Sequence, residues 1–272
     1  MSAITSKACR RVRLDELLVE RGLAPSRARA QALLLAGRVR VGAGDAGRAD
    51  RKPGDLVAPD ATVAVTAPEP YVSRGGHKLV AALDAFTIDP AGWVCLDVGA
   101  STGGFTDVLL QRGAARVYAL DVGRGQLADS LGRDPRVASI ERTNARHLRT
   151  GSLPEPVDLA TIDVSFISLR LVLGPVVSCV RDGGEVVALV KPQFEAGRGR
   201  SPHGVVRDPA IHRSVVREVV EHARGLGLTP RGLIASPILG PEGNREFLVH
   251  VGVGGDAIAL DLAARLDEVI AP

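Results

Sequence analysis

The fold is decided by the stretch Leu96-Asp97-Val98-Gly99-Ala100-Ser101-Thr102-Gly103-Gly104-Phe105. The apolar run 94–98 predicts a strand, the glycines predict a tight turn, and the apolar spacing after them predicts a helix. Glycine lets the backbone approach a ligand closely, and the first turn of a helix has free N–H groups. Asp121 ends the next predicted strand, where a carboxylate can accept hydrogen bonds from both ribose hydroxyls of a nucleoside cofactor.

The glycine spacing favours S-adenosylmethionine (SAM) over NAD as this cofactor. The turn reads Gly-Ala-Ser-Thr-Gly-Gly, whereas the dinucleotide pattern has glycine at its first, third and sixth positions. Asp97, at the strand end, suits an ammonium group better than a pyrophosphate, and the combination resembles the class I methyltransferase fold. The alternative is a tight turn with an unrelated carboxylate. The expected cofactor residues are Asp97, Gly99, Ala100, Ser101, Thr102, Gly103, Gly104, Phe105, Asp121 and, as an adenine contact, Asn144.

Strands and helices alternate along the second part of the chain. Strands are expected at 94–98, 117–121, 137–140, 159–164, 185–190 and 247–253, and helices at 106–112, 209–226 and 257–269. Such alternation predicts a doubly wound α/β sheet, with its ligands at the carboxyl ends of the strands. We expect this domain to span 73–272, after a linker at 67–72 that contains Pro68 and Pro70.

Residues 1–66 are expected to form a separate small domain. Leu14, Leu17 and Leu18 share one helical face, Ser26 suits the start of a second helix at 27–36, and short strands follow. Residues 1–60 hold 12 Lys and Arg against 7 Asp and Glu, a net charge of +5, which leaves −2 for the rest of the +3 chain. This asymmetry indicates a polyanion-binding module; the alternative is an ordinary solvated basic surface.

The order of these N-terminal elements carries a family resemblance. The opening Arg-Leu-Asp-x-Leu-Leu at 13–18 and the segment Ala-Gly-Arg-Val-x-Val at 36–41 resemble the S4 RNA-binding domain. S4 domains bind structured RNA, largely through its phosphates. The resemblance implies RNA contacts by Arg27, Arg29, Arg38 and Arg40.

Lysine is rare in this chain, which directs attention to individual lysines. Of 34 basic residues only Lys7, Lys52, Lys78 and Lys191 are lysine. Arginine stays protonated, whereas a partly desolvated lysine can act as a base near neutral pH. Lys191 ends an apolar strand, as does Asp163, and such strand ends form the rim where α/β folds place their chemistry.

Lys78, Asp163, Lys191 and Glu246 together resemble the Lys-Asp-Lys-Glu tetrad of the FtsJ/RrmJ-type 2′-O-ribose methyltransferases. The whole chain is similar to the TlyA family, historically called hemolysins. The motifs are Ser73-Arg74-Gly75-Gly76-His77-Lys78-Leu79, the glycine loop, Asp163-Val164-Ser165-Phe166, Lys191-Pro192-Gln193-Phe194-Glu195 and Gly243-Asn244-Arg245-Glu246.

This resemblance implies SAM-dependent methylation of a cytidine 2′-hydroxyl in the ribosomal RNA of ribosomal subunits. It also implies the division of labour in the tetrad: Lys191 takes the hydroxyl proton, Asp163 orients Lys191, and Lys78 and Glu246 position the ribose.

Two other functions stay open at this point. One is a membrane-active hemolysin, although the predicted 257–269 helix is acidic and no run of 18 apolar residues occurs. The other is an RNA-binding protein that keeps SAM without methyl transfer. Cys9, Cys95 and Cys179 are widely spaced and the six histidines lack metal-ligand spacing, so we expect neither a metal site nor a disulfide framework. The N-terminus has no apolar segment of a secretory signal, and the expected location is cytoplasmic.

Overall fold

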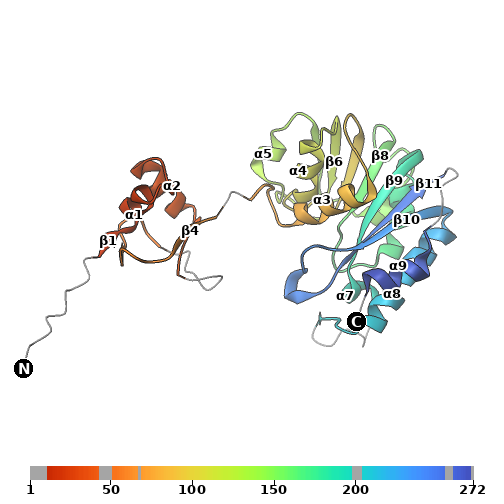
Figure 1. Ribbon diagram of the computed structural model, residues 1–272. Coiled ribbons are helices and arrows are strands. Elements are labelled where there is room, and N and C mark those ends of the chain that lie inside the picture. The colour runs from red at the N-terminus through yellow and green to blue at the C-terminus, as the bar shows by residue number, and fades with distance from the viewer. Residues whose placement is uncertain (1–10, 43–50, 67–68, 198–203, 255–259, 271–272) are drawn as a thin grey trace, which may run out of the picture. The chain divides into compact units, whose positions relative to one another are not determined.

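The computed structural model describes residues 11–42, 51–66, 69–197, 204–254 and 260–270 (Figure 1). Lys7, Cys9 and Pro68 lie outside these ranges, as do residues 257–259 of the expected last helix. The chain divides into two compact units, residues 1–70 and 71–272, and each is described separately. This division falls within the segment that the sequence analysis interprets as a linker.

The N-terminal unit is a helical hairpin with two short strand pairs. Its elements are β1 Val12–Arg13, α1 Leu14–Glu20, α2 Arg27–Leu35, β2 Val39–Val41, β3 Leu56–Val57 and β4 Val63–Val65. Ser26 caps α2, because its Oγ accepts a hydrogen bond of 3.3 Å from the Arg29 amide. Leu14, Leu18 and Leu34 form the buried contact between the helices.

The second unit is built on a mixed β-sheet. Within the described residues the sheet has the order β10-β11-β9-β8-β5-β6-β7. β5 to β9 are parallel to one another, and β11 is antiparallel to both of its neighbours. The strands are β5 Val94–Val98, β6 Arg116–Leu120, β7 Val137–Ile140, β8 Val157–Ile162, β9 Val180–Val190, β10 Leu228–Ala235 and β11 Phe247–Val253.

Helices cover both faces of this sheet. Along β9, Val186 and Val190 pack into one hydrophobic cluster, and the alternate residues Val187 and Leu189 pack into another. The first cluster is closed by α6 Leu173–Val177, α8 Pro209–Gly225 and α9 Leu262–Val269, and the second by α3 Gly75–Phe86, α4 Gly104–Gln111 and α5 Asp129–Gly132. The predicted α/β class is therefore confirmed. The remaining short helices are α7 Pro192–Glu195, η2 Ala145–His147, η3 Leu169–Leu171 and η5 Pro241–Gly243.

Several elements differ from the sequence-based expectation. The short helices α5 and α7 were not expected, and β9 begins at Val180 and not at residue 185. Neither α3 nor β10 was expected as an element. β10 is an edge strand that tolerates Pro230, and its register shifts between Pro230 and Gly232. α9 begins at Leu262 rather than at residue 257, because Asp261 caps it by accepting a hydrogen bond from the Ala264 amide.

Candidate active site

The glycine loop joins β5 to α4 and requires glycine at specific positions. Gly99 has φ of 84°, and a side chain there would collide with the carbonyl oxygen of Asp163 at the end of β8. Gly103 has φ of 96° and forms the N-cap of α4 without a side-chain bond. The loop can therefore pass close to β8 and leave the α4 amides for other partners.

Asp97 supplies the cap that Gly103 lacks. Its Oδ2 accepts hydrogen bonds from the Thr106 amide at 2.9 Å and from the Thr106 hydroxyl at 2.7 Å. The carboxyl is fully buried, and burial raises its pKa to about 7 although the bonds from Thr106 act in the opposite direction. Asp97 also lines the cavity next to the loop, so a cation bound there would favour its charged form.

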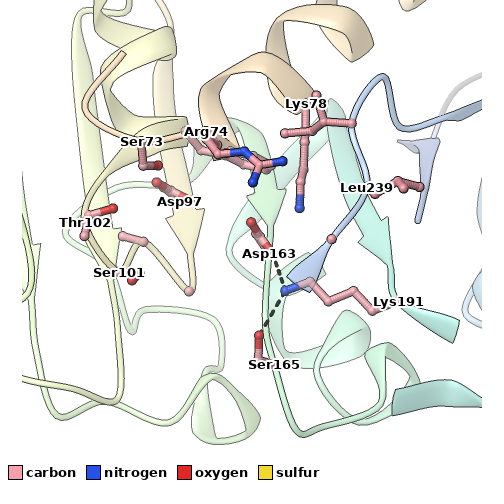
Figure 2. A pocket seen from close by; sticks show the side chains of 17 residues that line it. Ser73, Arg74, Lys78, Asp97, Ser101, Thr102, Asp163, Ser165, Lys191 and Leu239 are labelled. Atoms are coloured by element: carbon pink, nitrogen blue, oxygen red, sulfur yellow. Dashed lines mark hydrogen bonds and ion pairs between the residues drawn. The ribbon is translucent and has the colours of Figure 1, made fainter. Parts of the chain in front are cut away.

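That cavity has a volume of about 550 Å³ and lies at the carboxyl ends of the parallel strands (Figure 2). The glycine loop forms one wall, and residues of the α3 start form another. Its lining comprises Ser73, Arg74, Gly75, Lys78, Asp97, Gly99, Ala100, Ser101, Thr102, Gly104, Phe105, Asp163, Ser165, Lys191, Ile238, Leu239 and Gly240. A space of this size accommodates a small-molecule cofactor.

The four tetrad residues form two ion pairs at this cavity. Lys191 Nζ lies 2.6 Å from Asp163 Oδ1, and both residues line the cavity. Lys78 Nζ lies 2.5 Å from Glu246 Oε2, and the Glu246 side chain is fully buried behind it. Lys78 is part of the lining, whereas Glu246 reaches the cavity only through Lys78. The two pairs thus have different environments, one open to a ligand and the other largely buried.

Asp121 lies in a smaller hollow that shares Ala100 and Ser101 with the main cavity. Its Oδ2 accepts a hydrogen bond of 2.9 Å from the Ser101 amide, and its Oδ1 accepts one of 2.7 Å from the Gly123 amide. The carboxylate is therefore held at the end of β6, beside the glycine loop.

Asn144 lines neither hollow; its Oδ1 accepts a hydrogen bond of 3.1 Å from the Arg146 amide and caps η2. The hollow around Asp121 instead contains Gln126, Ser139 and Glu141, which the sequence analysis missed. Glu141 follows β7, so its position at the carboxyl end of a strand was a usable signal.

Two aromatic and two polar residues of the predicted motifs also meet here. Phe166 is 90% exposed, has φ of 62° and lies with its ring centroid 5.0 Å from that of Phe194. A bulky side chain in the left-handed region is strained, and such strain concentrates at functional sites. Ser165 Oγ accepts a hydrogen bond of 3.0 Å from Lys191 Nζ. The Glu195 carboxyl accepts hydrogen bonds from the Ser168 hydroxyl and the Leu169 amide, beyond Phe166.

The predicted RNA-binding arginines of the N-terminal unit have unequal surroundings. Arg27 pairs with Asp15 at 3.0 Å and with Glu16 at 3.2 Å, so its charge is balanced. Arg38 donates to the Thr66 carbonyl. Arg29 is exposed on α2 and forms no ion pair with the described residues.

Arg40 is half-buried on β2, the strand that pairs with β4. Compared with Arg27 and Arg38, Arg29 thus has the charge more available to an external anion.

A seven-stranded sheet with one antiparallel strand, as found in the described residues, and a glycine loop after the inner strand β5 define a class I methyltransferase fold. The family model of FtsJ-like methyltransferases matches residues 71–253, and that of the S4 domain matches residues 12–42.

Three related proteins cover most of the chain. The 16S/23S rRNA (cytidine-2′-O)-methyltransferase TlyA of Mycobacterium tuberculosis is 50% identical, with 88% of this chain and 89% of that protein covered. Hemolysin A of Brachyspira hyodysenteriae is 38% identical, with 88% and 99% covered. A solved Streptococcus thermophilus structure that carries a hemolysin name is 42% identical, with 97% and 96% covered and a TM-score of 0.74. The chain therefore belongs to the FtsJ-like methyltransferases and, among them, to the TlyA family.

Within the described ranges, no helix is both long and apolar enough to cross a membrane. The same ranges contain no group of three or more His, Cys, Asp or Glu side chains arranged to hold a metal ion.

Proposed function

We propose that this chain transfers the methyl group of SAM to the 2′-hydroxyl of a cytidine in ribosomal RNA. The observation that carries the proposal is the Lys191–Asp163 pair, which faces the same cavity as the glycine loop. A base and a cofactor cradle in one cavity match the needs of transfer to a weakly nucleophilic hydroxyl. The TlyA relative from Mycobacterium tuberculosis carries this activity in its name.

The residues present fit SAM. The glycine loop lines the cavity, and Gly99 lets it pass close to the Asp163 backbone. Asp97 offers a buried carboxyl to an ammonium group. Asp121, in the adjoining hollow, offers carboxylate oxygens to the ribose hydroxyls, and Glu141 and Gln126 lie beside it for the adenine. When bound, SAM supplies an electrophilic methyl group on a sulfonium centre.

The tetrad performs the proton transfer. Lys191, as the neutral amine, would accept the proton of the 2′-hydroxyl at Nζ as that oxygen takes the methyl group. The methyl group's bond to the sulfonium sulfur would break at the same time and leave a neutral thioether. Asp163, 2.6 Å away, stabilises the ammonium that results. Lys78, held by Glu246, places a second positive charge at the cavity wall, where it can orient the ribose.

The N-terminal unit supplies RNA affinity in this proposal. Its match to the S4 domain and its net charge of +5 over residues 1–60 suit contacts to RNA phosphates. Arg29, exposed on α2, is the leading contact among the four proposed arginines, Arg27, Arg29, Arg38 and Arg40, whereas the Arg27 charge is already paired with Asp15 and Glu16. The enzyme would act in the cytoplasm, where ribosomal subunits are found.

The test is methyl transfer by a Lys191→Arg variant to purified ribosomal subunits. Arginine keeps the positive charge but cannot act as a base, so turnover should fall by about two to four orders of magnitude. SAM and RNA binding should persist. Lys52→Arg, in the N-terminal unit, is the matched control and should retain turnover. Near-normal turnover of Lys191→Arg would remove the base from the proposal, and SAM binding without any transfer by the parent protein would support the RNA-binding alternative.

A further inference from the structure

Lys191 has a second contact that the tetrad does not account for. Its Nζ lies 3.0 Å from Ser165 Oγ, in addition to the 2.6 Å contact with Asp163 Oδ1 (Figure 2). Ser165 lines the cavity, and its side chain is exposed there. Both acceptor residues belong to the segment that follows β8, two residues apart.

Two neighbouring acceptor groups are enough to fix the orientation of a neutral lysine amine about its Cε–Nζ bond. The amine has two N–H bonds and one lone pair in a tetrahedral arrangement around Nζ. One N–H donates to Ser165 Oγ. Asp163 Oδ1 forms an ion pair with Nζ at 2.6 Å but no hydrogen bond among the described residues, so the second N–H has to turn toward it. The lone pair then has a single remaining direction. With Asp163 alone, the amine rotates about its Cε–Nζ bond and the lone pair samples two positions.

We infer that Ser165 is a positioning residue that aims the lone pair of Lys191 at the substrate hydroxyl. This inference rests on the proposed role of Lys191 as the base. Orientation of a catalytic group contributes strongly to rate, because a misdirected lone pair makes unproductive encounters.

The segment that carries Ser165 is itself fastened to the segment that carries Lys191. Glu195 is buried, four residues after Lys191, and its Oε1 accepts a hydrogen bond of 2.6 Å from the Leu169 amide. Its Oε2 accepts one of 2.6 Å from the Ser168 hydroxyl. The two segments are therefore also joined beyond Ser165, by one bond to a backbone amide and one to a side-chain hydroxyl.

This clamp provides a matched control. Ser168→Ala removes a hydroxyl of the same segment that contacts Glu195 but not Lys191. If Ser165 matters only for the stability of the segment, Ser168→Ala and Ser165→Ala should behave alike. Ser165→Thr keeps a hydroxyl at the same position and tests rescue.

The experiment compares the three full-length variants in methyl transfer to ribosomal subunits at saturating SAM. Ser165→Ala should lower kcat on the order of tenfold to a hundredfold with KM for both substrates unchanged. Ser165→Thr should recover most of the loss. Ser168→Ala should stay within about threefold, because it leaves both contacts of Lys191 and the Leu169–Glu195 bond in place.

The pH profile separates orientation from structure. Ser165 Oγ accepts from the ammonium form, so its removal should move the rising limb of kcat to lower pH by about half a unit to one unit. The other charged residues lining the cavity (Arg74, Lys78, Asp97 and Asp163) are the same in all variants. A purely structural loss would lower the curve without moving it.

Three results would overturn the inference. The first is full kcat in Ser165→Ala, and the second is an equal loss of kcat in Ser168→Ala. The third is a raised KM for RNA with unchanged kcat in Ser165→Ala, which would mean that the Ser165 hydroxyl contacts the substrate instead of Lys191. Calorimetric SAM binding and thermal unfolding confirm that each variant is folded. If Lys191→Arg keeps its turnover, the proposed base fails; if Lys191→Arg is inactive and Ser165→Ala is fully active, only the role of Ser165 fails.

Discussion

The buried pair of Lys78 and Glu246 leads to a prediction about stability. The two side chains are 9% and 0% exposed, and their charged atoms are 2.5 Å apart. Glu246→Gln keeps the shape of the side chain but leaves the Lys78 ammonium in a poorly solvated site without an opposite charge. Breaking a buried pair in this way costs about 3–5 kcal/mol.

This cost is large enough to measure by thermal unfolding. For a unit of this size, 1 kcal/mol corresponds to about 2–4 °C, so the melting temperature should fall by about 6–20 °C. Asp129→Asn is the control, because Asp129 and Arg133 form an ion pair at 3.5 Å whose side chains are 91% and 82% exposed. Its removal should change stability by less than about 1 kcal/mol.

A double variant separates the charge from the shape. Replacing both Lys78 and Glu246 by methionine removes the pair without leaving a lone charge, so most of the lost stability should return. Methyl transfer should not return with it, because Lys78 is then no longer present to orient the ribose. A melting temperature of Glu246→Gln within about 2 °C of the parent protein would refute the reasoning, because it would mean that the Lys78 ammonium does not depend on its partner.

Three further predictions concern the cofactor and the RNA. Burial raises the pKa of Asp97 to about 7, so its neutral form stabilises the folded protein at low pH, and this contribution is lost as the pH rises toward 7. An ammonium-bearing ligand favours the charged form of Asp97, so calorimetry should show tighter SAM binding at pH 8 than at pH 6. The Asp97→Asn variant should lack this pH dependence. Asp121→Ala should weaken SAM binding by on the order of 1.5–3 kcal/mol for each charge-assisted bond lost; unchanged affinity in the folded variant would contradict the assignment. Deletion of residues 1–66 should leave SAM binding intact but lower RNA affinity and its salt dependence, by roughly one unit of slope for each phosphate contact removed; full activity of the shortened chain on ribosomal subunits would argue against a docking role.

Local signals explain why the α/β class was predictable. The apolar strands and the glycine loop at Gly99–Gly104 depend on residues that are neighbours in the sequence. α3 was missed although Leu79, Ala82 and Leu83 have helical spacing, because the segment opens with two glycines, which are poor helix formers. β10 was missed because Pro230 and Gly232 interrupt its pattern, and only its edge position in the sheet makes them tolerable.

The pairing of the site residues could not be predicted from the sequence, because it depends on contacts between segments that are far apart in the chain. The residue types of the tetrad pointed to a site, but the pairing of Lys78 with Glu246, 168 positions apart, depends on the sheet order. The ion pair of Arg27 with the buried Asp15 on the neighbouring helix was not predictable from the sequence, and its RNA contact stays a prediction. The role of Ser165 beside Lys191 is likewise a product of tertiary structure.

The most direct test of the account is to identify the methylated atom. Purified ribosomal subunits are incubated with the protein and isotopically labelled SAM, the RNA is digested to nucleosides, and the labelled product is identified by mass spectrometry. The account predicts 2′-O-methylcytidine, formed by the parent protein and reduced by about two to four orders of magnitude with Lys191→Arg. A label on a nucleobase, or no label on RNA at all, would contradict it.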